Sequence, residues 1–379
     1  MMLINLWYVA ALESEVPADR PLGVRLLAHD LVLFWDADGV IRALSDTCIH
    51  RGASLCRGKV AGGRVACPYH GWQFDAEGRC RRIPSMGDDA VIPKRARVDA
   101  YPAAVKYGLV WVFIGDEPAA TRAPIPDAFA PYFNSPDWRC ISGKFRIEAN
   151  WQRVMENGLD TAHVHFVHPA FGNPDAARVN AVPIAEHEWG AKLNNTFTAA
   201  SIENKSGASR AALQEAGRAA PGSRKPTSEL QFHLSGLTIQ ILQTMAPGIV
   251  QCILSCDTPV DEFTTMAYWV QARSYKREPE HDADRAAMVR VVYEQDAAIV
   301  TALRPVFVPD RDLDELTVAA DAMPMRLRSK LAAWRASGHA LRIAARPASH
   351  AVTVLPSPAR AVDASGWVMT VAPREEKTA

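Results

Sequence analysis

Two short segments of the chain each combine one cysteine with one histidine. The first reads Cys48-Ile49-His50, and the second, after sixteen intervening residues, reads Cys67-Pro68-Tyr69-His70. Two cysteines and two histidines could bind zinc as a Cys₂His₂ site. Zinc fingers, however, usually place both cysteines in one pair and both histidines in the other. Because each segment here mixes the two residue types, zinc is the weaker interpretation.

A Rieske-type two-iron, two-sulfur centre requires this mixture, because two thiolates hold one iron and two imidazoles hold the other. Arg51-Gly52 follows the first segment and Gly71-Trp72 follows the second, and together they resemble the Rieske signature. The resemblance implies that each segment gives one ligand to each iron. The expected cluster ligands are Cys48, His50, Cys67 and His70.

The remaining cysteines bear on the class of Rieske protein. Respiratory-chain Rieske proteins carry an additional cysteine in each loop, and these two form a disulfide. The matching positions here are Ala53 and Tyr69. The respiratory class is therefore excluded, and the oxygenase or ferredoxin class remains. The other cysteines show no cluster spacing, and we expect buried free thiols at Cys56, Cys80, Cys140, Cys252 and Cys256.

A second group of candidate ligands contains the three histidines His163, His165 and His168. Ferrous iron that activates O₂ prefers two histidines and one carboxylate, which leave positions open for O₂ and substrate. On an ideal helix His165 and His168 share a face, whereas His163 and His168 do not. Pro169 weakens that objection, because a residue that precedes proline is biased out of helical geometry. The spacing alone leaves the ligand pair open.

The pattern Asp160-x-x-His163-x-x-x-x-His168, with Asn157 three residues upstream, resembles the mononuclear-iron motif of Rieske oxygenase α-subunits. The resemblance implies that His163 and His168 bind iron and that His165 does not. In that family the aspartate at the Asp160 position accepts a hydrogen bond from an iron histidine, which here would be His163.

The same family aspartate meets a cluster histidine of the neighbouring subunit, which here would be His70. A carboxylate between two imidazoles orients both rings and couples the two metals. The structural alternative is that Asp160 only caps a turn. We predict that Asp160 and Asn157 serve catalysis.

The resemblance also implies a third iron ligand, an aspartate on a helix far downstream. Asp296, in the segment Tyr293-Glu294-Gln295-Asp296, lies in the predicted helix Arg285–Leu303 at about the expected separation. Glu294 and the acids near Asp282 are alternatives. Asp296 could also be an ordinary solvated helix acid.

The elements that must position these residues change in type along the chain. Up to about residue 120, short strand patterns such as Leu109–Ile114 and turn signals such as Asp36-Ala37-Asp38-Gly39 indicate a small antiparallel β domain. A proline-rich stretch from Ala123 to Pro136 follows. We therefore predict a Rieske domain over residues 1–125 and a catalytic domain with the mononuclear iron over residues 126–379.

The predicted catalytic domain mixes helices and strands. Helical patterns cover Ala149–Ala162, Arg285–Leu303 and Met325–Ala336. Strand patterns cover Leu193–Ala199, Leu230–Leu242, Val250–Ser255 and Thr264–Gln271. We predict an α+β fold in which an antiparallel sheet is flanked by helices, of the helix-grip type. The polar segment Glu203–Ser228 lacks periodicity and is expected to be a mobile loop or lid.

Composition excludes several partner classes. The 379 residues include 42 Lys+Arg and 42 Asp+Glu, so the formal net charge is zero. This balance removes the electrostatic reason to expect nucleic acid or an anionic membrane. No apolar run approaches the roughly 18 residues of a membrane span, and the first residues do not resemble a signal peptide. We expect a cytoplasmic protein.

The source of electrons must lie outside this chain. It carries no dinucleotide fingerprint for NAD or flavin and no plant-type ferredoxin spacing, so electrons from NAD(P)H require a separate reductase or ferredoxin. The opening Leu6-Trp7-Tyr8-Val9-Ala10 resembles oxygenases similar to vanillate O-demethylase, dicamba monooxygenase and phthalate dioxygenase. These are typically ring-shaped trimers of α-subunits. A stretch from Val352 to Trp367 extends beyond the shorter members.

The resemblance implies a terminal oxygenase component that hydroxylates or demethylates an aromatic substrate with O₂ at a mononuclear Fe(II). Formation of a cis-diol by a ring-hydroxylating dioxygenase is the first alternative. A Rieske electron carrier without oxygenase activity is the second, and the intact set of His163, His168 and Asp296 argues against it.

Overall fold

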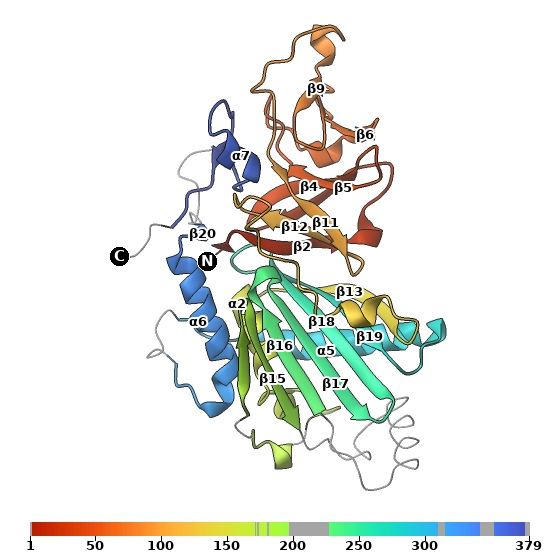
Figure 1. Ribbon diagram of the computed structural model, residues 1–379, viewed down its shortest axis with the longest axis vertical. Helices are drawn as coiled ribbons and strands as arrows, with labels where there is room; N and C mark the ends of the chain where they lie inside the picture. Colours follow the sequence, from red (N-terminus) through yellow and green to blue (C-terminus); the bar gives the residue numbers. More distant parts are fainter. Residues whose placement is uncertain are drawn as a thin grey trace. The chain divides into compact units, whose positions relative to one another are not determined.

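The computed structural model describes residues 2–170, 172, 174–179, 182–196, 227–309, 315–341 and 352–375. The chain forms two compact units (Figure 1). The first joins Met1–Ile125 with Thr258–Glu262 and Ala333–Ala379, and the second joins Pro126–Asp257 with Phe263–Ala332. Residues 333–379, which sequence patterns assign to the catalytic domain, therefore group with the first unit.

The first unit consists mainly of short β-strands. They are β2 (Leu6–Leu12), β3 (Leu22–Leu26), β4 (His29–Trp35), β5 (Ile41–Ser45), β6 (Lys59–Ala61), β7 (Arg64–Ala66), β8 (Gln73–Phe74), β9 (Cys80–Arg82), β10 (Ala100–Tyr101), β11 (Ala103–Lys106) and β12 (Leu109–Ile114). These strands form three sheets in the orders β10-β5-β4-β3, β11-β12-β2 and β6-β7-β8-β9. Their pairings are antiparallel, as predicted.

Turn chemistry explains the β4–β5 hairpin. The Asp36 Oδ1 atom accepts hydrogen bonds from the N–H groups of Asp38 and Val40, both at 2.9 Å. Gly39 has a φ of 71°, a conformation that costs glycine little because it has no β-carbon. The hairpin predicted from this turn is confirmed. So is the buried strand β12, in which every residue is buried.

The C-terminal extension packs on the first unit. Its elements are β21 (Thr353–Val354), α7 (Pro358–Val362) and β22 (Thr370–Val371). Arg360 donates to both carboxylate oxygens of Asp99, at 2.6 and 2.8 Å, and Asp99 is buried. The guanidinium groups of Arg97 and Arg360 also lie over the Trp367 ring, at 3.8 and 4.3 Å from its centroid. A buried bidentate ion pair of this kind holds the extension in a defined position.

One large antiparallel sheet dominates the second unit. Its strands are β13 (Arg139–Ile147), β14 (Ile184–His187), β15 (Gly190–Thr196), β16 (Thr227–His233), β17 (Thr238–Ala246), β18 (Ile249–Pro259) and β19 (Thr265–Arg273). They lie in the order β13-β19-β18-β17-β16-β15-β14 (Figure 1). The helices are α1 (Ala130–Phe133), α2 (Trp151–Leu159), α3 (Val164–Val167), α5 (Asp282–Val300) and α6 (Ala322–Ala336). The α+β fold class is confirmed.

The two faces of this sheet have different neighbours. A β-carbon on Gly158 of α2 would lie 2.7 Å from Ile239 Cδ1, so Ile239 faces α2. Ser255, opposite Ile239 in the strand register, has its hydroxyl 3.1 Å from the Tyr293 hydroxyl of α5. We call this side the helix face. Side chains that alternate with these along each strand point to the opposite side, which we call the outer face. Gln240 is one of them, and its side-chain amide donates a hydrogen bond to the Ala128 carbonyl.

Several predicted boundaries need correction. The segment Leu230–Leu242 is two strands rather than one, because the chain turns at Leu234–Gly236 and Leu237 adopts a left-handed φ of 45°. The predicted helix Ala149–Ala162 ends at Leu159. Most of the predicted loop Glu203–Ser228 lies outside the described residues, and its last two residues begin β16. No helix in the described part of the chain is long and apolar enough to cross a membrane.

Candidate metal centres

The two Cys–His segments of the first unit fold into loops with the same backbone hydrogen bonds. In each loop the cysteine N–H donates to the carbonyl five residues later, and the cysteine carbonyl accepts from a glycine N–H four residues later. These distances are 2.8 and 2.9 Å for Cys48, and 2.8 and 3.0 Å for Cys67. Gly52 and Gly71 also share a φ near 70°, at 71° and 70°. The loops thus present their side chains in equivalent ways.

The four predicted cluster ligands divide into a buried pair and a more accessible pair. Cys48 and Cys67 are 1% and 4% exposed and lie in the hydrophobic core of this part of the unit. The Nδ1 atoms of His50 and His70 lie 3.0 Å apart. The Trp72 ring stacks on His50 at 4.7 Å with an interplanar angle of 7°, which fixes the orientation of that imidazole.

This donor set fits the predicted cluster. Two ligands held at ~2.1 Å from one metal and at right angles lie about 3 Å apart, which matches the two Nδ1 atoms. Burial, and then the neighbouring Cys67, raise the pKa of the Cys48 thiol. Thiolates would therefore form on metal binding, with release of protons. A bound cluster would be shielded on its cysteine side and accessible on its histidine side.

In the second unit the predicted iron histidines bracket a single helical turn. His163 is the N-cap of α3 and His168 is its C-cap. His168 has φ −114° and ψ 84°, outside the helical region, as the following proline favours. The objection from ideal helical spacing therefore does not apply. Leaving the helix brings the Nε2 atoms of His163 and His168 to 3.3 Å from each other.

Asp296 reaches these histidines from α5. Its Oδ1 atom lies 3.4 Å from His163 Nε2 and 3.2 Å from His168 Nε2, so the three atoms form a nearly equilateral triangle. Among the described residues, these are the three side chains that converge closely enough to hold a metal ion. The edges are close to the ~3 Å expected for ligands at right angles around one metal.

Neighbouring side chains hold the triangle in place. Gln295 Oε1 accepts a hydrogen bond from His168 Nδ1–H at 2.8 Å, which leaves Nε2 as the lone-pair nitrogen. Burial favours the neutral form of Asp296, but contacts with His163, His168 and Asn157 hold the pKa of this carboxyl well below its usual range. Burial lowers the pKa of His168, but the nearby Asp296 carboxylate and the hydrogen bond with Gln295 outweigh burial and raise that pKa. Asp296 is therefore an anion beside two imidazoles.

The triangle has the polarity that a cation requires. Asp296 Oδ1 is buried, and no donor is oriented to give it a hydrogen bond. A carboxylate oxygen without a hydrogen-bond donor and two imidazole nitrogens thus converge on one point. Two histidines and one carboxylate are the donor set of mononuclear ferrous oxygenases. The residues present fit that ion.

Asp160 lies beside this group in a different way from the one expected. It is the C-cap of α2, with a ψ of 115°, so it follows the end of the helix rather than lying within it. Its Oδ1 atom accepts from the Ala162 N–H at 2.7 Å, which is the turn-capping role of the structural alternative. Its Oδ2 atom lies 3.8 Å from His163 Nδ1, beyond hydrogen-bond distance.

The other candidate ligands lie outside the group. Glu294 pairs with Arg290 at the surface, with a distance of 2.8 Å. Asp282 pairs with Arg139 and Arg273, at 2.5 and 2.6 Å. His165 is not a member of the converging group. The structure brings together the three side chains that the family motif indicates.

Sequence reasoning missed an ion-pair network that fixes α2. Arg328 of α6 donates to both carboxylate oxygens of Glu156, at 2.8 and 2.7 Å, and to Glu315 at 2.6 Å. Glu315 also accepts from the buried Arg153 at 2.7 Å. Arg153 and Glu156 belong to the helix that carries Asn157. Because the partners are far apart in the chain, no local pattern signals this network.

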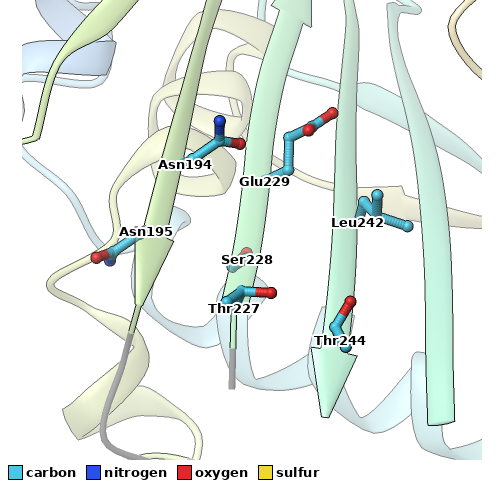
Figure 2. A pocket seen from close by; sticks show the side chains of 7 residues that line it. All are labelled: Asn194, Asn195, Thr227, Ser228, Glu229, Leu242 and Thr244. Atoms are coloured by element: carbon cyan, nitrogen blue, oxygen red, sulfur yellow. The ribbon is translucent and has the colours of Figure 1, made fainter. Parts of the chain in front are cut away.

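A pocket on the sheet lies apart from the metal group. Figure 2 shows its lining on β15, β16 and β17. The residues are Asn194, Asn195, Thr227, Ser228, Glu229, Leu242 and Thr244. Glu229 and Leu242 are register partners and belong to the outer face, whereas the metal group lies on the side of α2 and α5. We assign no function to this pocket.

Comparison with protein families identifies both halves of the chain. Residues 6–102 match the Rieske [2Fe-2S] domain, which contains the two Cys–His loops. Residues 147–337 match the vanillate O-demethylase oxygenase C-terminal domain. This second match spans half of the chain and includes all three converging side chains. The chain belongs to this Rieske oxygenase family.

Relatives of this oxygenase include components of monooxygenase and demethylase systems and a subunit of a dioxygenase, 3-chlorobenzoate-3,4-dioxygenase of Comamonas testosteroni. It is 29% identical to the toluene-4-sulfonate monooxygenase system iron-sulfur subunit TsaM1 of Comamonas testosteroni, over 85% of this chain and 94% of that one. It is 28% identical to methylxanthine N1-demethylase NdmA of Pseudomonas putida, over 85% of both chains. The structure of dicamba monooxygenase bound to dicamba has the same fold, with a TM-score of 0.71 at 22% identity over 88% of this chain and 97% of that one.

The family assignment defines the enzyme class. The oxygenase is an oxidoreductase, the terminal component of a Rieske system, and monooxygenation is favoured over dioxygenation. The interpretation as an electron carrier is not supported, because the second unit is an oxygenase domain.

Proposed function

We propose that this oxygenase holds a two-iron, two-sulfur cluster on Cys48, His50, Cys67 and His70, and one Fe(II) on His163, His168 and Asp296. When bound, the cluster supplies one-electron transfer and the Fe(II) supplies O₂ activation. The observation that carries the proposal is the triangle of Asp296 Oδ1 and two histidine Nε2 atoms, with edges of 3.2 to 3.4 Å.

The residues around the triangle have positioning roles in this proposal. Gln295 fixes the tautomer of His168, and Asn157 holds the Asp296 carboxylate. Such partners of metal ligands orient them and tune the metal. The accessible edges of His50 and His70 give a redox partner a short path to the cluster. We propose that this partner is a separate reductase or ferredoxin that carries electrons from NAD(P)H.

We also propose a homotrimer, or a multiple of it, in which one subunit's cluster serves the next subunit's iron. Asp160 supports this route, because its side chain is 31% exposed and its Oδ2 lies beside His163. The Asp160→Asn variant should contain both metals but turn over almost no substrate. Mixing Asp160→Asn chains with Cys67→Ala chains should restore activity. A complete absence of complementation in verified mixed oligomers would contradict the intersubunit route.

The proposed reaction is hydroxylation or demethylation of an aromatic compound in the cytoplasm. The family match and the monooxygenase and demethylase relatives support the reaction type, and the absence of a disulfide among the seven cysteines supports a reducing compartment. Hydroxylation of a methoxy carbon would release formaldehyde. A cis-diol from a ring-hydroxylating dioxygenase is the alternative product, and the mass of the product distinguishes the two.

The deciding experiment is a substrate screen with a surrogate reductase, in which formaldehyde, product mass and O₂ uptake are measured. His163→Ala should abolish product formation and leave the cluster reducible. His165→Ala is the matched control and should keep its iron and most of its activity. Loss of the mononuclear iron in His165→Ala, with retention in His163→Ala, would overturn the ligand assignment.

A further inference from the structure

Arg285 of α5 is a buried cation, and no carboxylate in the described part of the chain pairs with it. The residue is 5% exposed, and its Nε atom is buried with no hydrogen-bond partner. Its Nη1 atom donates a long hydrogen bond, 3.4 Å, to the Tyr275 hydroxyl. Burying a guanidinium is unfavourable unless an anion compensates for the lost hydration. Arg285 therefore lacks the partner that its burial calls for.

Other buried arginines of the second unit show what such a partner looks like. Arg273 is fully buried and pairs with Asp282 at 2.6 Å. Arg153 pairs with Glu315 at 2.7 Å. Among the residues that the structure describes, no aspartate or glutamate pairs with Arg285. The missing anion is thus specific to this position.

Amide side chains extend the polar environment of Arg285 across the helix face. The Tyr275 hydroxyl donates to Gln251 Oε1 at 3.2 Å. Gln251 Nε2 donates to Gln243 Oε1 at 2.6 Å, and Gln271 Nε2 donates to Gln251 Oε1 at 3.4 Å. Gln271 Oε1 is buried without a partner, whereas Gln243 and Gln251 are only half-buried. We call Arg285, Tyr275, Gln243, Gln251 and Gln271 the distal polar cluster.

This cluster lies on the same side as the metal group and at a defined distance from it. Arg285 precedes Asp296 by eleven residues, which is about three helical turns, or ~16 Å along α5. On β18, Gln251 precedes Ser255 by four residues, so both side chains lie on the helix face, ~13 Å apart along the strand. Ser255 contacts Tyr293, one turn before Asp296. Both elements therefore lead from the metal group to the distal polar cluster.

The residues between the two ends are apolar. Ile241 and Ile253 are register partners, share the parity of Gln243 and Gln251, and are half-buried. Val289 lies one turn after Arg285 on α5 and is buried. An aromatic ring suits such apolar surroundings, because it is flat, rigid and apolar.

We propose that the distal polar cluster binds an oxyanion of the substrate, a carboxylate or a sulfonate, with Arg285 as the counter-charge. The inference rests on the proposed function and adds the substrate class, an aromatic compound with an acid group opposite the carbon that is oxidised. In a para-substituted benzene these two groups lie about 6 Å apart. With a van der Waals contact at the metal end and a hydrogen bond at the other, the span reaches ~13 Å, comparable to the separation above.

The test measures ligand binding to the intact oxygenase by calorimetry, without reductase, so that no turnover occurs. The probes are matched pairs: 4-methoxybenzoate with 4-methoxybenzamide, and toluene-4-sulfonate with toluene-4-sulfonamide. Arg285→Met should weaken binding of the anions by about 10- to 100-fold, the range of charge-assisted hydrogen bonds, and leave the neutral amides within about twofold. The two pairs distinguish carboxylate from sulfonate.

Matched variants keep this test falsifiable. Arg290→Met changes an exposed arginine of the same helix, paired with Glu294, and should change no affinity. Arg285→Lys should retain part of the anion preference, because it keeps the charge and loses the planar fork. If Arg285→Met fails to fold, Tyr275→Phe and Arg285→Lys carry the test, each with a smaller loss for the anions alone.

Two results of the binding experiment would overturn the inference. One is a wild-type protein that binds the neutral amides as tightly as the anions. The other is an equal loss of both classes in Arg285→Met. The proposed function is judged separately: a wild-type enzyme that oxidises only neutral aromatic compounds keeps that function and refutes the oxyanion site. An enzyme that binds anions through Arg285 but oxidises no aromatic compound supports the site and refutes the function.

Discussion

The two candidate metal centres are built in opposite ways. The cluster loops take their four side chains from residues 48–70, and two equivalent sets of backbone hydrogen bonds shape them. The mononuclear group combines a short helical turn with Asp296, which lies 128 residues after His168 in the chain. The first centre depends on local loop conformation, whereas the second depends on the packing of α5 beside α2.

The centres also differ in their surroundings. In the cluster loops His70 is exposed and His50 is half-buried, so a redox partner can approach them. Asp296 and His168 are mostly buried and have Asn157 and Gln295 as neighbours. An electron-transfer site benefits from access, whereas a site that activates O₂ benefits from side chains that hold its ligands and exclude water. Loss of one centre should therefore leave the other intact.

The largest expected effect comes from Cys67→Ala. The variant should lose the cluster's visible absorption and both acid-labile sulfides, and product formation should fall to background. Iron should drop from about three per chain to about one, because the mononuclear group lies in the other compact unit. Iron and sulfide analysis with electron paramagnetic resonance checks this outcome. Zinc in the wild-type protein, in place of iron and sulfide, would contradict the cluster assignment.

Asp296→Ala should produce the complementary loss. Without the carboxylate the two histidines cannot hold Fe(II) tightly, so product formation should fall to background while the cluster stays reducible. Glu294→Ala is the matched control, because Glu294 is two residues away and pairs with Arg290 at the surface. Equal iron loss in both variants would indicate that α5 was disrupted rather than a ligand removed.

The same comparison explains how much could be predicted from the sequence. The cluster ligands follow from motif spacing, because the chemistry and the fold of those loops are both local. His163 and His168 follow from the family motif, and the effect of Pro169 on the backbone of His168 was foreseeable. The position of Asp160 at the end of α2 was not, because the one glycine near this end, Gly158, lies inside the helix rather than after its last residue.

Long-range partners were the least predictable. Gln295 was visible only as a neighbour of Asp296, and nothing in its spacing indicates a bond to His168. The pairing of Arg328 with Glu156 joins α6 to α2 across 172 residues. The placement of residues 333–379 with the first unit depends on contacts such as Arg360 with Asp99. Such contacts arise from tertiary packing, for which a single sequence carries no periodic signal.

A smaller effect is expected from Gln295→Leu, which removes a partner of a metal ligand but no ligand. His168 would lose the hydrogen bond that fixes its tautomer, so affinity for Fe(II) should fall about 10- to 100-fold. Titration of metal-free protein with Fe(II) under anaerobic conditions measures the change. Gln295→Glu keeps an acceptor at Nδ1 and should recover most of the affinity. If both variants bind iron like the wild-type protein, Gln295 does not position His168.

The smallest expected effect is on thermal stability rather than on activity. It concerns Asp257, in the unit that contains the mononuclear group. Asp257 is 2% exposed, and burial raises its pKa to about 7 against the opposing hydrogen bond from Ser255. The unfolded value is near 3.9, so the folded protein binds this proton more tightly. The contribution of Asp257 to stability is therefore fully present below about pH 4 and is lost as the pH rises through about 7.

The asparagine of Asp257→Asn cannot ionise, so this variant should not lose stability as the pH rises through about 7. We expect its melting temperature to exceed that of the wild-type protein by a few degrees at pH 8 and to approach it at pH 5, as measured by thermal unfolding of the metal-loaded oxygenase. Asp137→Asn changes an aspartate with an 86% exposed side chain and should keep the wild-type profile.

Because Ser255 contacts both Asp257 and Tyr293 of α5, the ionised carboxylate would strain the packing that brings Asp296 to the histidines. A pH profile of Asp257→Asn parallel to that of the wild-type protein would show that Asp257 is already ionised in the fold, and that the packing around α5 tolerates the charge.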